Sequence, residues 1–171
     1  MAISSLEELC KLEVVKHGLD RTDLPAVLAK ELEQLEERIV SAFSGTYRNH
    51  EAWPWGTFKL AWRQGQWEFI LQGLQTLVLV VRAGIENQLG MAGGFLFGLV
   101  GMGRNVNLSD FRIDLGKEEL SFFGSWSTNR SAKNRPVKIV LSPPVLSHHG
   151  FGLVKTFTCL DSDFDTSLTP V

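Results

Sequence analysis

The chain has few of the features that mark secreted, membrane-spanning or polyanion-binding proteins. Its 171 residues include only two cysteines, Cys10 and Cys159, which are too few for a disulfide framework, although the sequence leaves a single bond between them open. The longest apolar run covers residues 89–102 and holds five glycines, which is shorter than the ~20 residues of a membrane-spanning helix. The net charge of −2 argues against a polyanion as the partner of the whole chain.

Local motifs for catalysis, metal binding and cofactor binding are also missing from the sequence. It contains no G-x-S-x-G, no H-E-x-x-H and no phosphate-binding G-K-[ST]. His148 and His149 are adjacent, which rarely allows joint chelation, and no Cys/His cluster accompanies them. Residues 161–165 imitate the start of a calcium loop, but Thr166 stands where that loop needs glycine. We therefore expect a non-enzyme with no cofactor and no metal.

The distribution of charge points to protein partners. Residues 1–44 hold five Lys/Arg against nine Asp/Glu, whereas residues 45–171 hold twelve against ten. An acidic N-terminal segment followed by a slightly basic remainder suits a protein-binding module better than a nucleic-acid-binding one. Because Glu7 and Glu8 stand where a signal peptide would have an apolar segment, we expect a cytoplasmic or nuclear protein that does not bind membranes.

Two helices are expected at the start of the chain. From Leu6 the apolar residues recur at helical spacing, with Ser4 or Ser5 available as N-cap and Gly18 placed to end the helix. A second helix is expected from a cap at Thr22 or Asp23. Its apolar stripe is formed by Leu24, Leu28, Leu32, Leu35, Ile39 and Phe43.

After the Ser44-Gly45 boundary the apolar period changes from that of a helix to that of a strand. Residues 57–63 and 66–72 alternate between apolar and polar side chains, and Gln64-Gly65 between them predicts a hairpin turn. Further strands are expected at residues 77–82, 111–115, 120–126, 137–141 and 153–159. The fold class is therefore α+β, a helical pair followed by a mostly antiparallel sheet, sandwich or small barrel. The expected divisions are a helical module at 1–44, a β-rich domain at 45–160 and a flexible tail at 161–171.

Residues 5–14 read Ser-Leu-Glu-Glu-Leu-Cys-Lys-Leu-Glu-Val and match the pattern S-L-x-x-x-C-x-x-x-Φ. This segment resembles the BC box through which SOCS-box and VHL-box proteins bind the elongin B–elongin C pair. The resemblance places Ser5, Leu6, Cys10 and Val14 at the contact with elongin C. It implies a non-catalytic substrate receptor or adaptor of a cullin-RING ubiquitin ligase, in which ubiquitin transfer takes place on other subunits.

The following segment resembles the second motif of such proteins. Residues 24–32 fit Φ-P-x-x-Φ-x-x-x-Φ, with Leu24, Pro25, Leu28 and Leu32 at its fixed positions. This looks like the box that binds cullin-2, since Ala26-Val27 stands where a cullin-5 box would have Φ-P. The resemblance covers residues 5–32 only, lies at the N-terminus rather than at the commoner C-terminal place, and leaves the protein target of the β-rich domain open.

The same residues also allow a simpler interpretation. Leu6, Cys10 and Val14 recur every four residues, so they form one narrow apolar row that either fits a partner's groove or packs on the protein's own sheet. The alternative function is then a self-assembling structural protein, or a lipid- or ligand-binding β protein of the viral matrix type. To separate the two, we predict that residues 33–43 pack on the sheet and that residues 5–28 stand clear of it.

Two further segments are candidates for contacts. Arg130, Lys133, Arg135 and Lys138 form a run without an acid, which suits a phosphate or an acidic target as well as an ordinary solvated loop. The glycine-rich residues 90–103 are expected to form a strand or a loop held against the core, because glycine disfavours a helix in water. The alternative for this second segment is a surface loop that contacts a partner or lipid.

Overall fold

The structure is a computed structural model of the full chain, and it describes residues 5–48, 57–72, 75–97, 105–128, 131–144 and 150–159. Two helices, α1 (Leu6–Lys16) and α2 (Ala26–Phe43), precede the strands, and a short helix α3 (Gly90–Leu96) lies between β5 and β6. The strands are β1 (Gly45–Arg48), β2 (Thr57–Arg63), β3 (Gln66–Leu71), β4 (Leu77–Arg82), β5 (Asn87–Leu89), β6 (Asn105–Asp114), β7 (Glu119–Thr128), β8 (Ser131–Ser142) and β9 (Gly152–Cys159). No helix in the described part of the chain is long and apolar enough to span a bilayer.

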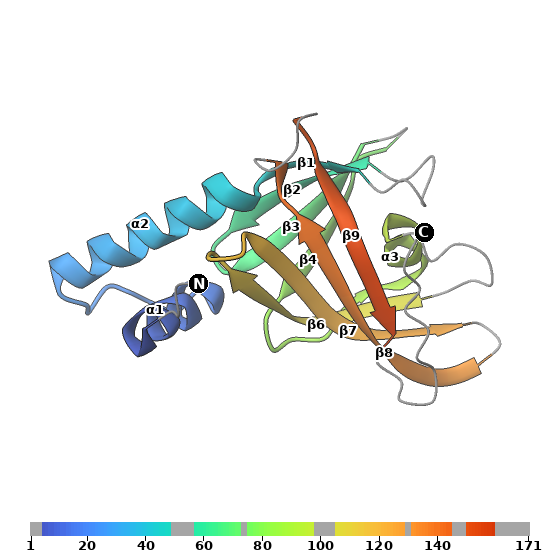
Figure 1. Ribbon diagram of the computed structural model, residues 1–171. Coiled ribbons are helices and arrows are strands. Elements are labelled where there is room, and N and C mark those ends of the chain that lie inside the picture. The colour runs from blue at the N-terminus through green and yellow to red at the C-terminus, as the bar shows by residue number, and fades with distance from the viewer. Residues whose placement is uncertain are drawn as a thin grey trace.

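The strands form one nine-stranded sheet in the order β4-β3-β2-β1-β9-β8-β7-β6-β5. Neighbouring strands are antiparallel except β1 and β9, which are parallel and bring the two ends of the β-rich region together. The sheet curls into a nearly closed, barrel-like shape (Figure 1). The amide of Gly84, just after β4, donates to the carbonyl of Ser109 in β6 at 2.8 Å and joins the two margins of the sheet. The expected α+β class is confirmed, and the barrel-like form decides between the alternatives.

The β2–β3 hairpin forms where the sequence predicts it. Arg63 pairs with Gln66, so the turn consists of Gln64 and Gly65, whose φ angles are 46° and 84°. Two consecutive positive φ angles give the turn a twist that matches the flanking strands. The alternating pattern is confirmed as well, because Phe58, Leu60, Trp62, Trp67, Phe69 and Leu71 all point into the core.

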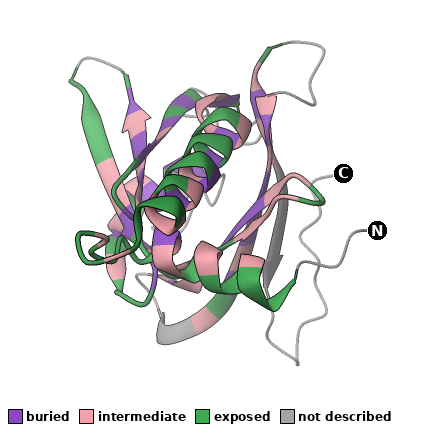
Figure 2. Ribbon diagram, turned by 90° about the vertical axis from the view of Figure 1, so that its left-hand side faces the viewer, coloured by how far each residue is buried: buried purple, intermediate pink, exposed green. Residues whose placement is uncertain are grey.

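The two N-terminal helices cover one end of the curled sheet. Viewed from that side, α2 lies across the opening with strands on both sides of it (Figure 2). Leu35, Ile39 and Phe43 are buried, and the Phe43 ring meets Trp67 edge-on at 6.3 Å. The prediction that residues 33–43 pack on the sheet is therefore confirmed.

The companion prediction, that residues 5–28 stand clear of the sheet, is wrong for the second half of α1. Val15 has 0% of its surface exposed and belongs to the same hydrophobic core as the strands. The Lys16 ammonium also lies 2.9 Å from the Asp110 carboxylate of β6. The error arises because the motif draws attention to the row that ends at Val14. Val15 is the next residue, and since a helix turns about 100° per residue, it points to a different side of α1.

The expected strand or loop at residues 90–103 is wrong for its first half, which forms α3. Each glycine disfavours a helix by up to about 1 kcal/mol, but tertiary packing overrides that preference here. Leu96 and Phe97 are buried, and the Phe97 ring packs on Phe69 at 5.6 Å. Gly93 is required by space, since a Cβ there would lie 2.6 Å from the Cβ of Leu89. Residues 98–103 lie outside the described residues.

The second helix begins later than expected. Thr22 and Asp23 precede it, and Pro25 is its N-cap without a side-chain hydrogen bond. Thr22 instead donates from its amide and its hydroxyl to the Asp20 carboxylate, which makes a local turn between the helices. The expected 161–171 tail lies outside the part of the chain that the structure describes.

Candidate protein-docking site

Helix α1 is well specified by its own sequence. Ser5 caps it, accepting a hydrogen bond from the Glu8 amide at 3.2 Å, and Glu7 and Glu8 occupy the first turn, where the helix dipole favours acids. His17 ends the helix, and Gly18 follows with a φ of 59°, a conformation that favours glycine. Both ends fall where the sequence predicts them.

The apolar row of the BC-box-like segment lies largely on the solvent side of α1. Leu6 is 77% exposed and Cys10 is exposed with a free thiol. Val14 is partly buried and packs against the core. Since Val15 is wholly buried on the opposite side, the protein's own sheet uses the other face of the helix. Leu9 extends the exposed row and is 49% exposed.

A network of ion pairs attaches α1 to α2. The Lys11 ammonium lies 2.8 Å from the Glu7 carboxylate in α1 and 2.7 Å from the Glu31 carboxylate in α2. Hydrogen bonds from Lys11 to Glu31 and Glu7 raise the pKa of Lys11 to about 12, and the bond to Lys11 lowers the pKa of Glu7. Lys11 is charged at neutral pH and links the two helices through its ion pair with Glu31.

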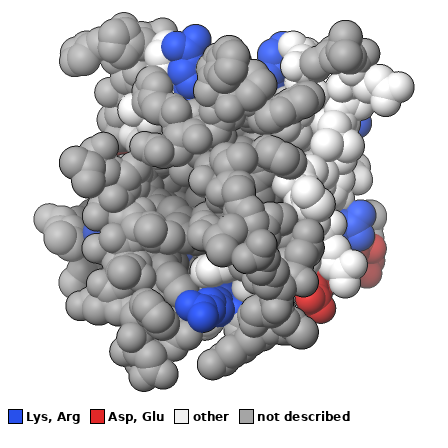
Figure 3. All heavy atoms as spheres, turned by 90° about the vertical axis from the view of Figure 1, so that its right-hand side faces the viewer, with Lys and Arg blue, Asp and Glu red and all other residues white. Residues whose placement is uncertain are grey.

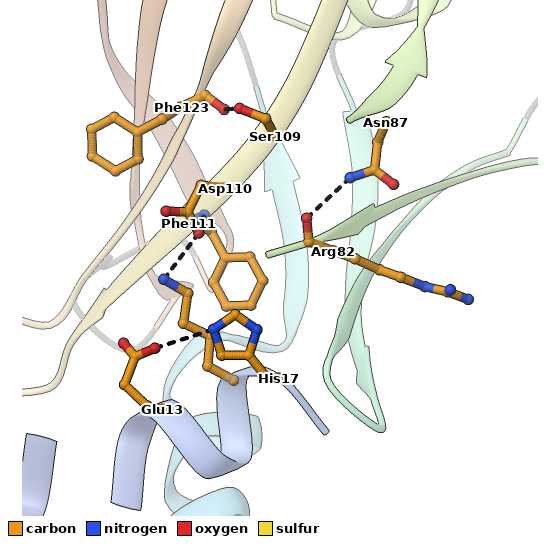
Figure 4. A network of polar contacts seen from close by, with 9 residues as sticks. Glu13, His17, Arg82, Asn87, Ser109, Asp110, Phe111 and Phe123 are labelled. Atoms are coloured by element: carbon orange, nitrogen blue, oxygen red, sulfur yellow. Dashed lines mark hydrogen bonds and ion pairs between the residues drawn. The ribbon is translucent and has the colours of Figure 1, made fainter. Parts of the chain in front are cut away.

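The C-terminal end of α1 is attached to the sheet. Lys16, which pairs with Asp110, also places its ammonium 5.3 Å from the centre of the Phe111 ring. Figure 4 shows Asp110 and Phe111 of β6 facing this end of α1, where the Nε2 atom of His17 is hydrogen-bonded to the Glu13 carboxylate at 3.1 Å.

The connection after α1 also touches the β2–β3 turn through two glycines. A Cβ on Gly65 would lie 2.7 Å from the Gly18 nitrogen, and a Cβ on Gly18 would lie 2.7 Å from the Gln64 carbonyl oxygen. Neither position accepts a side chain without displacement of backbone. Helix α1 is thus held on α2, on β6 and on this turn, and its exposed row is presented on a fixed support.

A groove of about 960 Å³ lies beside the exposed row, between α1 and the β6–β7 hairpin. Its apolar lining comes from Leu9 and Leu12 of α1 and from Phe111, Ile113, Leu115 and Phe123 of the hairpin. Each side of the groove carries charges of both signs, with Glu8, Glu13 and Lys16 on the helix side and Asp110, Arg112, Asp114 and Lys117 on the hairpin side. The groove gives the exposed row an adjoining apolar surface that is bordered by charges of both signs.

A larger cleft of about 1530 Å³ lies between α2, the β2–β3 turn and the segment after β4. Most of the acidic and basic side chains that line it form ion pairs or hydrogen bonds with other residues of the protein. Arg63 is 3.5 Å from Glu68, Arg82 donates to Gln66 at 2.9 Å, and Glu36 accepts the Trp62 indole N–H at 2.7 Å. This cleft therefore presents no single ligand chemistry.

The residues of the cullin-2-box-like segment are less accessible than those of the first box. Leu32 is buried, and Leu24 and Leu28 are partly buried against the core. Pro25 is exposed, and its neighbour Val27 is 72% exposed. Of this second segment, only the start of α2 presents apolar surface to a partner.

The basic run at residues 130–138 is divided by the sheet. Arg135 and Lys138 are three residues apart on β8, so they point to opposite faces. Arg135 lies 5.6 Å from the Trp126 ring, whereas Lys138 lies 5.8 Å from the Phe123 ring. Arg130 and the Lys133 side chain lie outside the described part of the chain.

Lys138 is joined on its face by a residue that the sequence pattern missed. Arg112 of β6 lies 5.9 Å from the Phe123 ring, because β7 places Phe123 between the two cations. Figure 3, which views the end opposite the helices, shows the described Lys and Arg side chains at separate places. We find no combined phosphate site among the described residues of the 130–138 run.

Comparison with known proteins does not add a family. No protein-family model matches the chain, and neither a curated protein nor a solved structure matches it. Among the described residues there is also no group of three His, Cys, Asp or Glu side chains that could hold a metal ion.

Proposed function

We propose that the protein is a non-catalytic adaptor that binds the elongin B–elongin C pair through α1 and presents a target to a cullin-RING ubiquitin ligase. The observation that supports this most is the orientation of α1. Leu6 and Cys10 face solvent while Val15, on the other side of the helix, belongs to the core. A helix that lays an apolar row into a partner's groove needs this arrangement.

Further support comes from how firmly the row is held. Ser5 caps α1, and the Lys11–Glu31 and Lys16–Asp110 ion pairs attach its middle to α2 and its C-terminal end to β6. A helix that is ordered before binding loses less conformational entropy on association. The cullin-2 contact has narrower support, because it rests on the exposed Pro25 and Val27 at the start of α2.

The central test is binding of purified elongin B/C to the full chain, measured by calorimetry. The double variant Leu6→Ala with Cys10→Phe removes the leading anchor and places a bulky ring where two backbones must approach. Truncation of one anchor in an interface commonly costs about 2 kcal/mol or more, so we expect at least about a 30-fold loss of affinity. Unchanged affinity in the double variant would refute the proposal.

Two controls separate this site from other exposed apolar residues. Leu19→Ala removes a leucine that is 54% exposed but lies outside the row, so elongin binding should be unchanged. Val27→Lys alters the start of α2, so it should leave elongin binding intact and weaken recruitment of cullin-2 to the preformed complex. Circular dichroism of each variant should match that of the wild type.

A further inference from the structure

Strand β4 ends the sheet with an exposed apolar edge. It pairs with β3 on one side and is the last strand in the sheet order. Leu77 and Val78 are 44% and 46% exposed, and as neighbours in a strand they point to opposite faces. Figure 2 shows β4 at the border of the sheet, with the first half of the strand coloured as exposed.

The other margin of the sheet does not cover this edge within the described residues. The backbone bond that joins the margins runs from Gly84 to Ser109, beyond the C-terminal end of β4. Strand β5, at the opposite margin, has three residues and pairs with β6. Among the described strands, the first half of β4 therefore pairs with β3 alone and with none on its other side.

The edge also lacks the residues that commonly prevent edge-to-edge pairing. Natural edge strands often carry a lysine, a proline or a bulge that disfavours a second strand. Residues 77–81 read Leu-Val-Leu-Val-Val, without charge, proline or glycine, and pair with β3 in unbroken register. The first charged residue is Arg82, at the end of the strand, where its side chain donates to Gln66.

We propose that β4 pairs with β4 of a second copy of this chain, forming an antiparallel two-fold dimer centred on Leu79. In that register Leu77 lies opposite Val81 and Val78 lies opposite Val80, so apolar residues meet on both faces of the extended sheet. Arg82 lies opposite Thr76 rather than opposite its own counterpart, so no like charges meet. The self-complementary, uncharged sequence favours a second copy as the occupant, since a two-fold contact requires one patch to fit itself.

Sedimentation equilibrium and amide hydrogen exchange of the full chain test this dimer. The wild type should change from monomer to dimer between low and high micromolar concentration, with the amides of residues 77–81 gaining protection at the higher concentration. Val78→Lys places a charge on both strands at an exposed position, so we expect the dimer dissociation constant to rise at least about tenfold. The concentration-dependent protection should disappear in the same variant.

A matched control is Val27→Lys, which adds the same charge at an exposed valine on α2 and should leave dimerisation unchanged. A wild type that stays monomeric at high micromolar concentration would overturn the proposal. So would a dimer that Val78→Lys leaves intact, or one whose protection from exchange falls elsewhere than on residues 77–81. Elongin binding is measured separately and has no bearing on these outcomes.

Discussion

Tyr47 offers a direct test of how the helices and the sheet share one core. It is the chain's only tyrosine, and its side chain is wholly buried. Its hydroxyl donates to the Phe43 carbonyl at the end of α2 at 2.7 Å, and its ring stacks on Phe58 at 5.5 Å. Replacing Tyr47 with phenylalanine keeps the ring and removes the hydrogen bond, so unfolding should become easier by about 1 kcal/mol at pH 8.

The pH dependence should reverse that difference. Burial raises the pKa of Tyr47 above the value of about 10 that an unfolded tyrosine has. Above pH 10 the unfolded chain therefore releases this proton and the folded chain keeps it, so the stabilisation is complete below that pH and declines as the pH rises. From pH 8 to pH 11 the wild type should lose about 1.4 kcal/mol more than Tyr47→Phe.

Urea unfolding followed by tryptophan fluorescence at several pH values measures this difference. Lysines also titrate in this pH range, but they are the same in the wild type and in Tyr47→Phe, so their effect on stability cancels in the comparison. Phenolate absorbance gives a second readout, since no other residue of the chain produces it. In the folded protein the phenolate should appear only as the chain unfolds. Parallel loss of stability in the two proteins, or an ordinary tyrosine titration in the folded state, would refute the reasoning.

The remaining predictions concern how α1 is held. Val15→Ala should lower the free energy of unfolding by about 2 kcal/mol, because Val15 is fully buried. Leu6→Ala, at an exposed position, should change it by less than about 0.5 kcal/mol. Equal effects of the two variants in urea unfolding would mean that α1 is oriented differently. Gly65→Ala should destabilise the protein by more than about 1 kcal/mol, because the new Cβ meets Gly18 and φ is 84°. Hydrogen exchange should show the loss of protection concentrated in the second half of α1, and an unaffected α1 would contradict the glycine contact.

Much of the fold could be predicted from local sequence patterns, because the spacing of apolar residues indicates which face of a helix or strand is buried. Alternation at Phe58, Leu60 and Trp62 depends only on the strand period, and the turn at Gln64-Gly65 depends only on two positive φ angles. The start of α1 depends on a serine cap and acidic first-turn residues. Each of these signals lies within a few residues of the structure that it predicts.

The sequence alone did not reveal the short strands β1 and β5. Strand β1 has four residues and is defined by its two partners, β2, which follows next in the chain, and β9, which is the last strand. Strand β5 has three residues and depends on β6. Strands this short carry too few side chains to show a period, so their pairing decides their existence.

For the candidate site, the sequence determined the composition of the apolar row, and the tertiary structure decided which face of α1 it occupies. Leu6, Cys10 and Val15 are all apolar residues of one helix, and nothing local shows that Val15 rather than Cys10 enters the core. That choice depends on α2, β6 and the glycine contact at the β2–β3 turn, which together set the rotation of α1. Likewise, Arg135 and Lys138 belong to one basic run of the sequence, but alternation along β8 sends their side chains to opposite faces of the sheet. Strand pairing then places Lys138 and Arg112, from segments distant in the chain, on either side of Phe123.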